Sequence, residues 1–468
     1  MTERKSFEVT VLGSGPGGYV AAIKAAQLGK KTALIEKKDL GGVCLNVGCI
    51  PTKTLLAGSH VLKQVKRAKE FGIHIGNLSF DFAAMKLRKD RVVGTLKTGL
   101  AHLLKQNGVE IFSGEGKFTS PNELKVLGKD NFLLSFEKCI IATGSEPLDI
   151  QAFPCDHKKI LNSTSILELT ELPKSIVIIG GGYIGCEFAS LYAELGVAVT
   201  IVEALPSILS LLGATIAKTM TKAFQELKIE VLTNTSVEGI KNTETGVTVS
   251  LQGGKTLQAD LALVAVGRKV NSENLGLDKA LVKLGEKGEI EVDEYMQTSS
   301  EGIFAIGDVT GKVLLAHVAS HQGLVAAVNA CGGKAQMHYE AVPAVVFTSP
   351  EVAMVGLTEE EAKKQGYPIN IGLFPFQALG KSIASAETKG FTQILSDSKT
   401  GQILGVIVIG YEASSLIAEM ALAIQNELTI DSVIDTIHAH PTIAEAWLES
   451  ALIAKGTPLH FPQKKKTP

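Results

Sequence analysis

The chain has 468 residues, a formal net charge of −2 at pH 7, 45% hydrophobic residues and 20% charged residues. This length suggests about three domains, each large enough for its own core, and the near-neutral charge excludes a protein built to bind nucleic acid. No apolar run reaches the ~20 residues that span a bilayer, and a strand pattern begins by residue 7, which leaves no room for a signal peptide. We therefore expect a cytoplasmic protein without a membrane segment.

The first predicted element is a strand at residues 7–13, FEVTVLG, which leads into GSGPGG and a helical pattern. Gly13, Gly15 and Gly18 have the spacing of a dinucleotide-binding turn. In such a turn the first glycine makes the bend, the second lets a pyrophosphate approach the backbone, and the third packs helix against strand. The next strand, TALIE, ends at Glu36, where a carboxylate can accept hydrogen bonds from a ribose. The alternative is that Glu36 merely ends a strand in solvent.

Residues 41–53 read GGVCLNVGCIPTK and place Cys44 and Cys49 five positions apart. In a regular helix their Cα atoms would lie roughly 8 to 9 Å apart, beyond the roughly 7 Å limit for a disulfide. A bond between them therefore needs the irregular backbone that the glycines of this segment allow. Cys49 falls near a predicted helix start and Lys53 four residues later, and both a helix N-terminus and a nearby cation favour a thiolate. The segment indicates a reactive dithiol; the alternative is two inert buried thiols.

The other four cysteines show no CxxC spacing and no pairing with histidines, so no metal site is expected. We expect all four to be unpaired packing residues: Cys139, Cys155, Cys186 and Cys331. Because the cytoplasm is reducing, a permanent structural disulfide is not expected either. The Cys44/Cys49 pair is therefore better explained as catalytic.

The nucleotide-binding pattern recurs in KSIVIIGGGYIG, with Gly180, Gly182 and Gly185, and the strand after the next helix ends in Glu203. The repetition predicts a second dinucleotide. A carboxylate suits the ribose 2′-hydroxyl of NAD and repels the 2′-phosphate of NADP, which usually meets an arginine. No arginine occurs in ALPSIL, the residues after Glu203, so we expect NAD.

A series of motifs along almost the entire chain resembles the flavin- and NAD(P)-dependent disulfide oxidoreductases, and within them the branch that oxidises dihydrolipoamide. The motifs are GSGPGG (13–18), GGVCLNVGCIPTK (41–53), ATGS (142–145), GGGYIGCE (180–187), AVGRKVN (265–271), IFAIGDVT (303–310) and HAHPTIAEA (438–446). The resemblance implies FAD at the first nucleotide unit and NAD at the second. It also implies a redox disulfide between Cys44 and Cys49 against the flavin, with Lys53 near the flavin N5.

The resemblance implies further cofactor contacts outside the glycine turns. Asp308 would bind the flavin ribitol, although by itself it would be taken for a carboxylate in an ordinary Gly-Asp turn. Glu187 would lie near the nicotinamide, although it could equally be an acid favoured in the first turn of a helix. The other implied contacts are Thr143, Gly144, Gly267 and Ala316.

A dithiol that opens and closes must exchange protons with a base that titrates near neutral pH, and histidine fits best. HAHPTIAE combines His440, Pro441 and Glu445. The residues alone favour a satisfied core histidine. With the resemblance, His440 becomes the expected acid/base and Glu445 the group that holds its imidazole. His438, two positions earlier, is expected to be structural.

The pattern of elements and the resemblance together predict an α/β fold: two doubly wound Rossmann-like nucleotide-binding domains plus an α+β C-terminal dimerisation domain. The predicted units are an FAD-binding domain (1–149), an NAD-binding domain (150–270), a return to the FAD-binding domain (271–342) and a dimerisation domain (343–468). In the family the histidine comes from the partner subunit. The resemblance therefore implies a homodimer with a shared active site.

The implied reaction is the oxidation of protein-bound dihydrolipoamide to lipoamide with NAD+, with attack at Cys44 and Cys49 left as a thiolate. The implied partner is the lipoyl-bearing acyltransferase (E2) of 2-oxo acid dehydrogenase complexes, or a glycine-cleavage carrier. Three alternatives stay open. A glutathione-type reductase would favour NADP. A mercuric reductase would usually carry a C-terminal cysteine pair, which the tail TPLHFPQKKKTP lacks. A non-catalytic scaffold or adhesin would not need the cysteine and histidine motifs.

Overall fold

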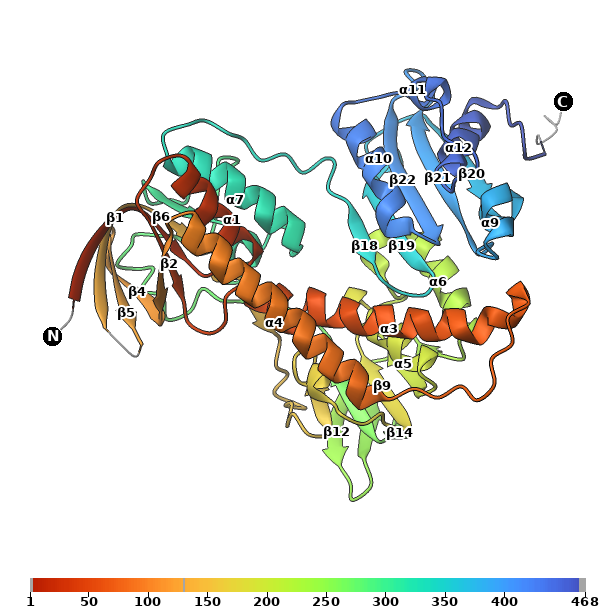
Figure 1. Ribbon diagram of the computed structural model, residues 1–468, viewed down its shortest axis with the longest axis horizontal. Coiled ribbons are helices and arrows are strands. Elements are labelled where there is room, and N and C mark those ends of the chain that lie inside the picture. Colours follow the sequence, from red (N-terminus) through yellow and green to blue (C-terminus); the bar gives the residue numbers. More distant parts are fainter. Residues whose placement is uncertain (1–2, 129–130, 463–468) are drawn as a thin grey trace.

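The computed structural model describes residues 3–128 and 131–462, arranged as three units (Figure 1). The main sheet of the first unit is mixed, that of the second is parallel and that of the third is antiparallel. The first sheet has the strand order β3-β2-β1-β6-β5-β4, with β17 beside β6. Its strands are β1 (Glu3–Leu12), β2 (Thr32–Glu36), β3 (Glu110–Ser113), β4 (Glu115–Ser120), β5 (Glu123–Leu127), β6 (Phe132–Ile141) and β17 (Ile303–Ala305). The β1, β2, β3, β6 and β17 pairings are parallel, whereas β4, β5 and β6 pair antiparallel.

Two helices from opposite ends of the nucleotide-binding region, α1 (Pro16–Gln27) and α7 (Ala316–Ala330), lie side by side against this sheet (Figure 1). Glycines let them approach closely. A Cβ added to Gly17 would lie 2.7 Å from the carbonyl oxygen of Ala319, and one added to Gly323 would lie 2.5 Å from that of Gly17. The chain therefore returns to its first unit after the second one.

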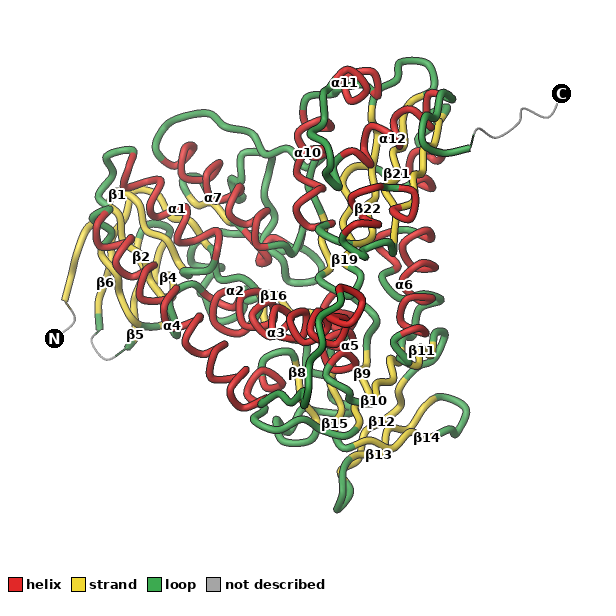
Figure 2. Tube along the Cα trace, turned by 45° about the vertical axis from the view of Figure 1, so that its right-hand side comes forward, coloured by secondary structure: helices red, strands yellow, loops and turns green. Residues whose placement is uncertain are grey.

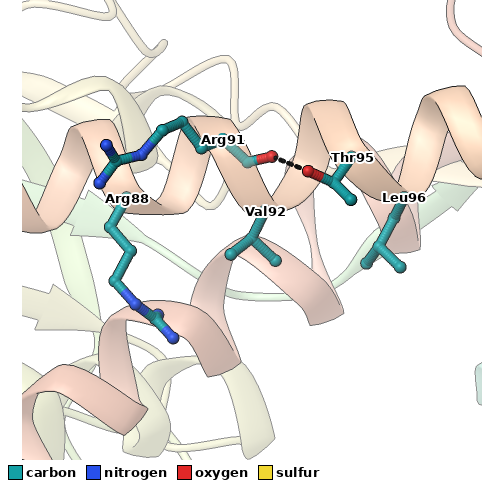
Figure 3. A pocket seen from close by; sticks show the side chains of 5 residues that line it. All are labelled: Arg88, Arg91, Val92, Thr95 and Leu96. Atoms are coloured by element: carbon teal, nitrogen blue, oxygen red, sulfur yellow. Dashed lines mark hydrogen bonds between the residues drawn. The ribbon is translucent and has the colours of Figure 1, made fainter.

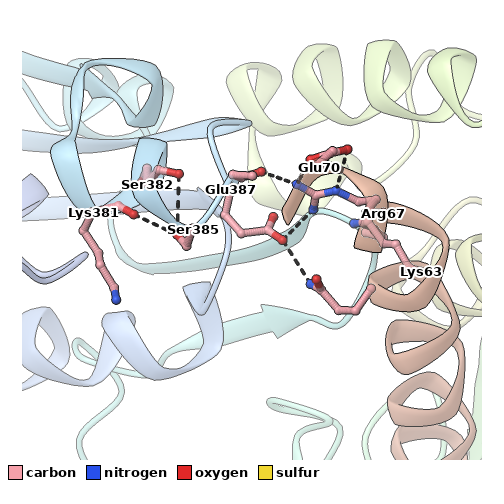
Figure 4. Close-up of polar contacts among 10 residues, drawn as sticks. Lys63, Arg67, Glu70, Lys381, Ser382, Ser385 and Glu387 are labelled. Carbon is pink, nitrogen blue, oxygen red and sulfur yellow. Dashed lines mark hydrogen bonds and ion pairs between the residues drawn. The ribbon is translucent and has the colours of Figure 1, made fainter. Parts of the chain in front are cut away.

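Two long helices cross the middle of the molecule (Figure 1). The helical segments here are α2 (Gly42–Val47), α3 (Cys49–Arg67), the 3-10 helix η1 (Ala68–Phe71) and α4 (Phe82–Gln106). The far end of α3 is held on the C-terminal unit, because Arg67 donates to Glu387 Oε1 at 2.7 Å and Gln64 donates to the same oxygen at 3.1 Å (Figure 4). Lys63 adds a hydrogen bond to Ser349 Oγ at 2.6 Å. The far end of the helix that begins at Cys49 is thus fixed on the C-terminal unit.

The second unit has a parallel five-stranded sheet in the order β11-β10-β9-β15-β8 and a separate three-stranded antiparallel sheet, β12-β13-β14. The strands are β8 (Ile160–Asn162), β9 (Ser175–Ile179), β10 (Ala198–Val202), β11 (Glu230–Leu232), β12 (Val237–Asn242), β13 (Val247–Leu251), β14 (Thr256–Ala259) and β15 (Leu261–Val264). The helices are η2 (Ser165–Glu168), α5 (Tyr183–Glu194), η3 (Ser210–Leu212) and α6 (Ala214–Glu226). The short antiparallel pair β7 (Ser145–Pro147) and β16 (Arg268–Val270) connects this unit to the first.

The C-terminal unit is an antiparallel sheet, β18-β19-β22-β21-β20, covered by helices (Figure 2). Its strands are β18 (Ala344–Val346), β19 (Glu351–Gly356), β20 (Ile369–Pro375), β21 (Gly390–Asp397) and β22 (Ile403–Gly410). Its helices are α8 (Glu359–Lys364), η5 (Phe376–Ala378), α9 (Gly380–Ala384), α10 (Ala413–Gln425), α11 (Ile430–Asp435) and α12 (Glu445–Lys455). One further short helix, η4 (Gly307–Thr310), belongs to the first unit and precedes α7. Every residue of β22 is buried, which is why ILGVIVIG shows no alternation.

Two absences concern the described ranges, 3–128 and 131–462. No helix there has both the length and the apolar character that crossing a bilayer requires. No group of three or more histidine, cysteine or acidic side chains there is placed to hold a metal ion.

Candidate active site

The first glycine turn joins β1 to α1 and leaves space at the helix N-terminus. Gly13 has a φ of +103°, and a Cβ there would lie 2.3 Å from the carbonyl oxygen of Ala142. A Cβ on Gly18 would lie 1.9 Å from the carbonyl oxygen of Gly13, so both positions require glycine. A Cβ on Gly15, in contrast, would meet nothing within 4 Å. A phosphate group therefore has room to approach the backbone at Gly15.

The carboxylate at the end of β2 is held by hydrogen bonds from the same turn. Glu36 Oε2 accepts from the backbone N–H of Ser14 at 2.9 Å and from Ser14 Oγ at 2.6 Å. Glu36 Oε1 accepts from the N–H of Lys38 at 2.8 Å. These contacts fix an anionic acceptor beside the space at Gly15, and such an acceptor suits the hydroxyls of a ribose.

The second glycine turn repeats this geometry between β9 and α5. Gly180 has a φ of +105°, with a Cβ position 2.4 Å from the carbonyl oxygen of Ala265, and a Cβ on Gly185 would lie 1.9 Å from the carbonyl oxygen of Gly180. Gly182 again faces open space. Both turns therefore fit a dinucleotide.

The second carboxylate is also fixed by backbone donors. Glu203 Oε2 accepts from the N–H of Gly181 at 2.6 Å, and Oε1 accepts from the N–H of Leu205 at 2.8 Å. No arginine lies in the adjoining segment 204–209. The site favours a free 2′-hydroxyl over a 2′-phosphate, since a phosphate would face an oriented carboxylate.

A disulfide joins Cys44 and Cys49, whose Cα atoms are 4.6 Å apart. This separation is shorter than a continuous helix allows, because the helix breaks at Gly48, which has φ −141° and ψ −109° between α2 and α3. A Cβ on Gly48 would lie 3.0 Å from the carbonyl oxygen of Val43 and 3.2 Å from the Cα of Cys44. The predicted irregular backbone is therefore present.

The disulfide segment rests on the first glycine turn. The N–H of Gly41 donates to the carbonyl of Ser14 at 3.1 Å, and a Cβ on Gly42 would lie 2.7 Å from the Cα of Gly15. Gly42 has a φ of +60°. Contacts between backbone atoms thus hold the segment that leads into Cys44 against the first nucleotide turn.

Lys53 of α3 and Glu187 of α5 form an ion pair that the sequence did not predict. Lys53 Nζ lies 2.6 Å from Glu187 Oε2 and 2.8 Å from Oε1. Glu187 also accepts from the N–H of Phe347 at 3.0 Å, and the Lys53 ammonium lies 4.7 Å from the centre of the Phe347 ring. The pair therefore joins the helix that begins at Cys49 to α5, in which Glu187 is the fifth residue and lies past the first turn.

Asp308 lies in a network with Ser145 and Arg268. Ser145 Oγ donates a hydrogen bond to Asp308 Oδ2, and Arg268 Nε donates to Ser145 Oγ at 2.7 Å. Arg268 Nε is itself 3.7 Å from Asp308 Oδ2. Burial lowers the pKa of Arg268 from its ordinary value, and the charge of Asp308 opposes this shift. The Arg268 guanidinium thus orients the Asp308 carboxylate through Ser145. The sequence did not reveal this network, although Arg268 is part of the AVGRKVN motif.

Three of the remaining predicted contacts, Thr143, Gly144 and Gly267, lie on the segments that link the two nucleotide units. Thr143 Oγ1 donates to the carbonyl of Asn271 at 2.7 Å, and the N–H of Asn271 donates to the carbonyl of Gly144 at 2.9 Å. Gly144 and Gly267 have φ values of +69° and +140°. Ala316 is the first residue of α7. The ATGS and AVGRKVN motifs are thus bound together.

His440 and Glu445 form a pair on the C-terminal unit. His440 Nδ1 lies 2.9 Å from Glu445 Oε1, and the N–H of Thr442 donates to Oε2 at 2.8 Å. Burial raises the pKa of Glu445, but the hydrogen bonds from His440 and Thr442 outweigh it, and the pKa falls below its ordinary value. The His440 side chain is 78% exposed. An ionised Glu445 thus orients an imidazole whose other nitrogen faces outward.

His440 and the disulfide of the same chain do not meet. His440 lies between α11 and α12, whereas Cys44 lies in α2 and Cys49 is the first residue of α3; α11 and α3 lie in different units (Figure 1). Among the described residues no hydrogen bond joins His440 to Cys44 or Cys49. One chain therefore does not assemble all of the predicted catalytic groups in one place.

The other four cysteines are unpaired, as the sequence predicted. Burial raises the pKa of the Cys139 and Cys186 thiols far above the ordinary value and that of Cys155 to about 11. Burial also raises the pKa of Cys331. These thiols are protonated at neutral pH and weak nucleophiles.

A hollow on the outer face of α4 contains none of these residues (Figure 3). It measures about 290 Å³ and is lined by Arg88, Arg91, Val92, Thr95 and Leu96. Thr95 Oγ1 donates to the carbonyl of Arg91 within the helix at 2.9 Å. The hollow adds nothing to the candidate site.

The chain resembles one family along most of its length. Residues 7–323 match the family described as "Pyridine nucleotide-disulphide oxidoreductase", and residues 342–451 match its "dimerisation domain". A dihydrolipoyl dehydrogenase of Chlamydia muridarum is 49% identical, over 99% of this chain and 100% of its own length. One of Geobacillus stearothermophilus is 44% identical, over 97% of each chain.

Solved structures agree with this assignment. LpdA from Mycobacterium tuberculosis superposes with a TM-score of 0.90 at 28% identity, covering 96% of this chain and 99% of that one. The HOCl-induced flavoprotein disulfide reductase RclA from Escherichia coli, in a Cu(II) complex, has a TM-score of 0.87 at 28% identity, with coverage of 96% and 99%. The chain therefore belongs to the pyridine nucleotide-disulphide oxidoreductase family, whose members use FAD and NAD, and its C-terminal unit is the family's dimerisation domain.

Proposed function

We propose that this protein is a dihydrolipoyl dehydrogenase, which oxidises protein-bound dihydrolipoamide to lipoamide with NAD+. The observation that carries the proposal is the Cys44–Cys49 disulfide packed on the first glycine turn. A dithiol substrate can exchange with such a disulfide. Cofactors bound at the two dinucleotide turns can then accept the electrons that the disulfide takes from the substrate. The relatives named dihydrolipoyl dehydrogenase, at 49% and 44% identity, support the choice of substrate.

The exchange begins at Cys44. One thiolate of the dihydrolipoyl arm attacks the Cys44 sulfur, the bond between the two cysteines breaks, and Cys49 leaves as a thiolate. The second lipoyl thiolate then displaces Cys44 and closes the lipoyl disulfide, so the substrate loses two electrons and two protons to the protein. Cys49 suits the leaving role because it is the first residue of α3, where the helix N-terminus stabilises negative charge.

Each of the two nucleotide turns binds one cofactor. FAD, when bound, supplies an acceptor for the electron pair of the reduced cysteines and a hydride donor to NAD+. The first turn and Glu36 hold FAD, and the second turn and Glu203 hold NAD. The other residues assigned to cofactors are Lys53, Thr143, Gly144, Glu187, Gly267, Asp308 and Ala316. Lys53, fixed by Glu187, holds a positive charge on the helix that carries Cys49 and stabilises its thiolate.

His440 is the proton acceptor for the attacking thiol, and it acts on the partner subunit's disulfide. Its 78% exposed side chain has no partner among the described residues except Glu445, and the neighbouring Ile437 is 97% exposed. An apolar side chain left in solvent beside a catalytic pair is typical of a surface that a second copy covers. The active site is therefore shared across a homodimer.

The same proposal includes the domain bounds, the protein that carries the lipoyl arm and the location in the cell. We assign residues 1–149 and 271–342 to FAD binding, 150–270 to NAD binding and 343–468 to dimerisation. The lipoyl arm belongs to the acyltransferase (E2) of a 2-oxo acid dehydrogenase complex or to a glycine-cleavage carrier. The proposed location of the protein is the cytoplasm.

Rapid mixing of the oxidised holoprotein with dihydrolipoamide, glutathione and NADPH in turn tests the substrate assignment. Dihydrolipoamide should reduce the protein within the time of one turnover, whereas the other two should not. Efficient turnover of only glutathione with NADPH would show a glutathione-type reductase instead. A dithionite titration is the independent check, because a flavin and a disulfide together accept four electrons and a flavin alone accepts two.

The Cys49→Ser variant separates an enzyme from a scaffold. It should bind FAD but lose oxidation of dihydrolipoamide, since no disulfide remains. The matched control is Cys331→Ser, which removes a half-buried unpaired thiol away from the site and should retain full activity. Wild-type turnover by Cys49→Ser would overturn the proposed function.

A further inference from the structure

His438 lies between two hydrogen-bond acceptors in the loop before the His440–Glu445 pair. Its Nε2 is 3.0 Å from Oε1 of Glu419 on α10, and its Nδ1 is 3.1 Å from the carbonyl oxygen of Thr436. The side chain is 5% exposed. The ring is therefore held on both sides and largely removed from water.

This arrangement fits only one protonation state. A neutral imidazole carries one N–H and one lone pair, so one of the two contacts would turn a lone pair towards an oxygen. The imidazolium donates to both oxygens and leaves no polar atom unsatisfied. The hydrogen bond to Glu419 is the main cause that raises the pKa of His438, burial opposes it, and the charges of Glu419 and Glu445 add to the rise.

The charge of His438 reaches the catalytic pair. It is one of the influences that lower the pKa of Glu445, after the contacts of His440 and Thr442. The charged groups that act on His438 come from two elements, Glu419 on α10 and Glu445 on α12. A fixed cation at this position favours the ionised form of Glu445, the carboxylate that holds the His440 ring at 2.9 Å.

We propose that His438 is a positioning residue, a permanent imidazolium that anchors the loop of His440 on α10 and sets the pH range in which His440 accepts a proton from the substrate. This inference rests on the proposed role of His440. It differs from the expectation of a merely structural histidine, because it assigns the charge of His438 an effect on the reaction.

The test is the pH dependence of the single-turnover reduction of the holoprotein by dihydrolipoamide, compared between wild type and His438→Gln. Loss of the cation should move the acidic limb of the profile to higher pH by roughly 0.5 unit, because two charges a few residues apart interact weakly across a partly solvated surface. The matched control is His460→Gln. His460 Nδ1 lies 2.7 Å from Glu449 Oε1, on the same helix as Glu445, and His460 is not among the groups that lower the pKa of Glu445.

An upward shift in His438→Gln with an unchanged profile in His460→Gln supports the inference. A rate lowered equally at every pH, or the same shift in both variants, overturns it. The His440→Gln variant distinguishes a failure of the inference about His438 from a failure of the proposed role of His440. If His440→Gln is inactive while His438→Gln keeps the wild-type profile, only the inference about His438 fails. If His440→Gln keeps the wild-type rate, the proposed base is wrong and the inference fails with it.

A measurement on the wild-type holoprotein tests the charge of His438 even if the His438→Gln variant does not fold. With ¹⁵N-labelled histidine, both ring nitrogens of His438 should carry protons at pH 7, and they should keep them as the pH rises past the ordinary value of 6.5. A resonance pattern of a neutral ring at pH 7 overturns the inference.

Discussion

At the scale of single residues, the Lys53–Glu187 pair combines positions that no local pattern connects. Glu187 is 7% exposed and Lys53 31%, so removing one charge leaves the other in a partly desolvated place. Glu187→Gln should lower the free energy of unfolding by about 1–3 kcal/mol and slow the reduction of the disulfide. Chemical denaturation and rapid-mixing kinetics measure the two effects.

The matched control for Glu187→Gln is Glu226→Gln, which breaks the exposed pair between Glu226 and Lys389. Exposed pairs contribute ~0–1 kcal/mol, so this variant should change neither stability nor kinetics appreciably. Equal effects of the two substitutions would show that the position of the Lys53–Glu187 pair has no special role.

Glu445 gives a prediction about acid stability. Its pKa is lowered in the folded protein from an ordinary 4.5, so the ionised carboxylate stabilises the fold above pH 4.5, and this contribution disappears as the pH falls through the folded pKa. The difference in unfolding free energy between wild type and Glu445→Gln should therefore be constant from pH 7 to about 5 and shrink at lower pH. A difference that grows on acidification would contradict the assigned direction.

At the scale of elements, the contact between the disulfide segment and the first glycine turn is made by backbone atoms. A Cβ on Gly42 would lie 2.7 Å from the Cα of Gly15, which cannot move like a side chain. Gly42→Ala should therefore displace the segment, weaken FAD retention and slow reduction by dihydrolipoamide several-fold. The ratio of flavin absorbance to protein absorbance, together with single-turnover rates, measures the result.

Gly29→Ala is the control for backbone strain. Gly29 also has a positive φ, +84°, but a Cβ there would meet nothing within 4 Å. It should lose ~1 kcal/mol of stability from its left-handed conformation and keep normal flavin binding. If Gly29→Ala lost flavin as readily as Gly42→Ala, strain rather than contact would explain both.

At the scale of the whole molecule, the separation of His440 from the cysteines of its own chain predicts complementation between inactive variants. Cys49→Ser and His440→Gln should each be inactive. A dimer that combines them has one site with both groups intact and one with neither. Random mixing of the two chains should therefore restore about a quarter of wild-type activity.

Co-expression with two different affinity tags provides the measurement, because mixed dimers can be purified through both tags. These dimers should have about half of the wild-type activity. Activity of mixed dimers no higher than that of the parent variants would show that each chain works alone, and the shared site would have to be abandoned.

The features that were predictable from sequence are local. The two glycine turns depend on the strand before and the helix after them, and the break at Gly48 depends on neighbouring residues. The His440–Glu445 pair spans five positions. The α/β fold follows because alternating strand and helix patterns allow few arrangements other than a parallel sheet.

The contacts that sequence did not reveal join distant positions. Lys53 and Glu187 are 134 residues apart, and Ser145 and Asp308 are 163 apart. Glu419 on α10 and His438 in the loop after α11 are 19 apart. No periodicity marks such pairs, since each partner looks like an ordinary polar residue in its own segment. The domain boundaries and the residue roles stay predictions.

The sequence by itself determined which segments turn, which cysteines can be joined and which helix begins at Cys49, because backbone sterics and hydrogen bonding act within a few residues. Only the tertiary structure decided that the disulfide rests on the first nucleotide turn, that Glu187 meets Lys53 and that His438 lies between two acceptors. Those contacts depend on how sheets and helices pack, and packing brings together residues whose separation along the chain carries no signal.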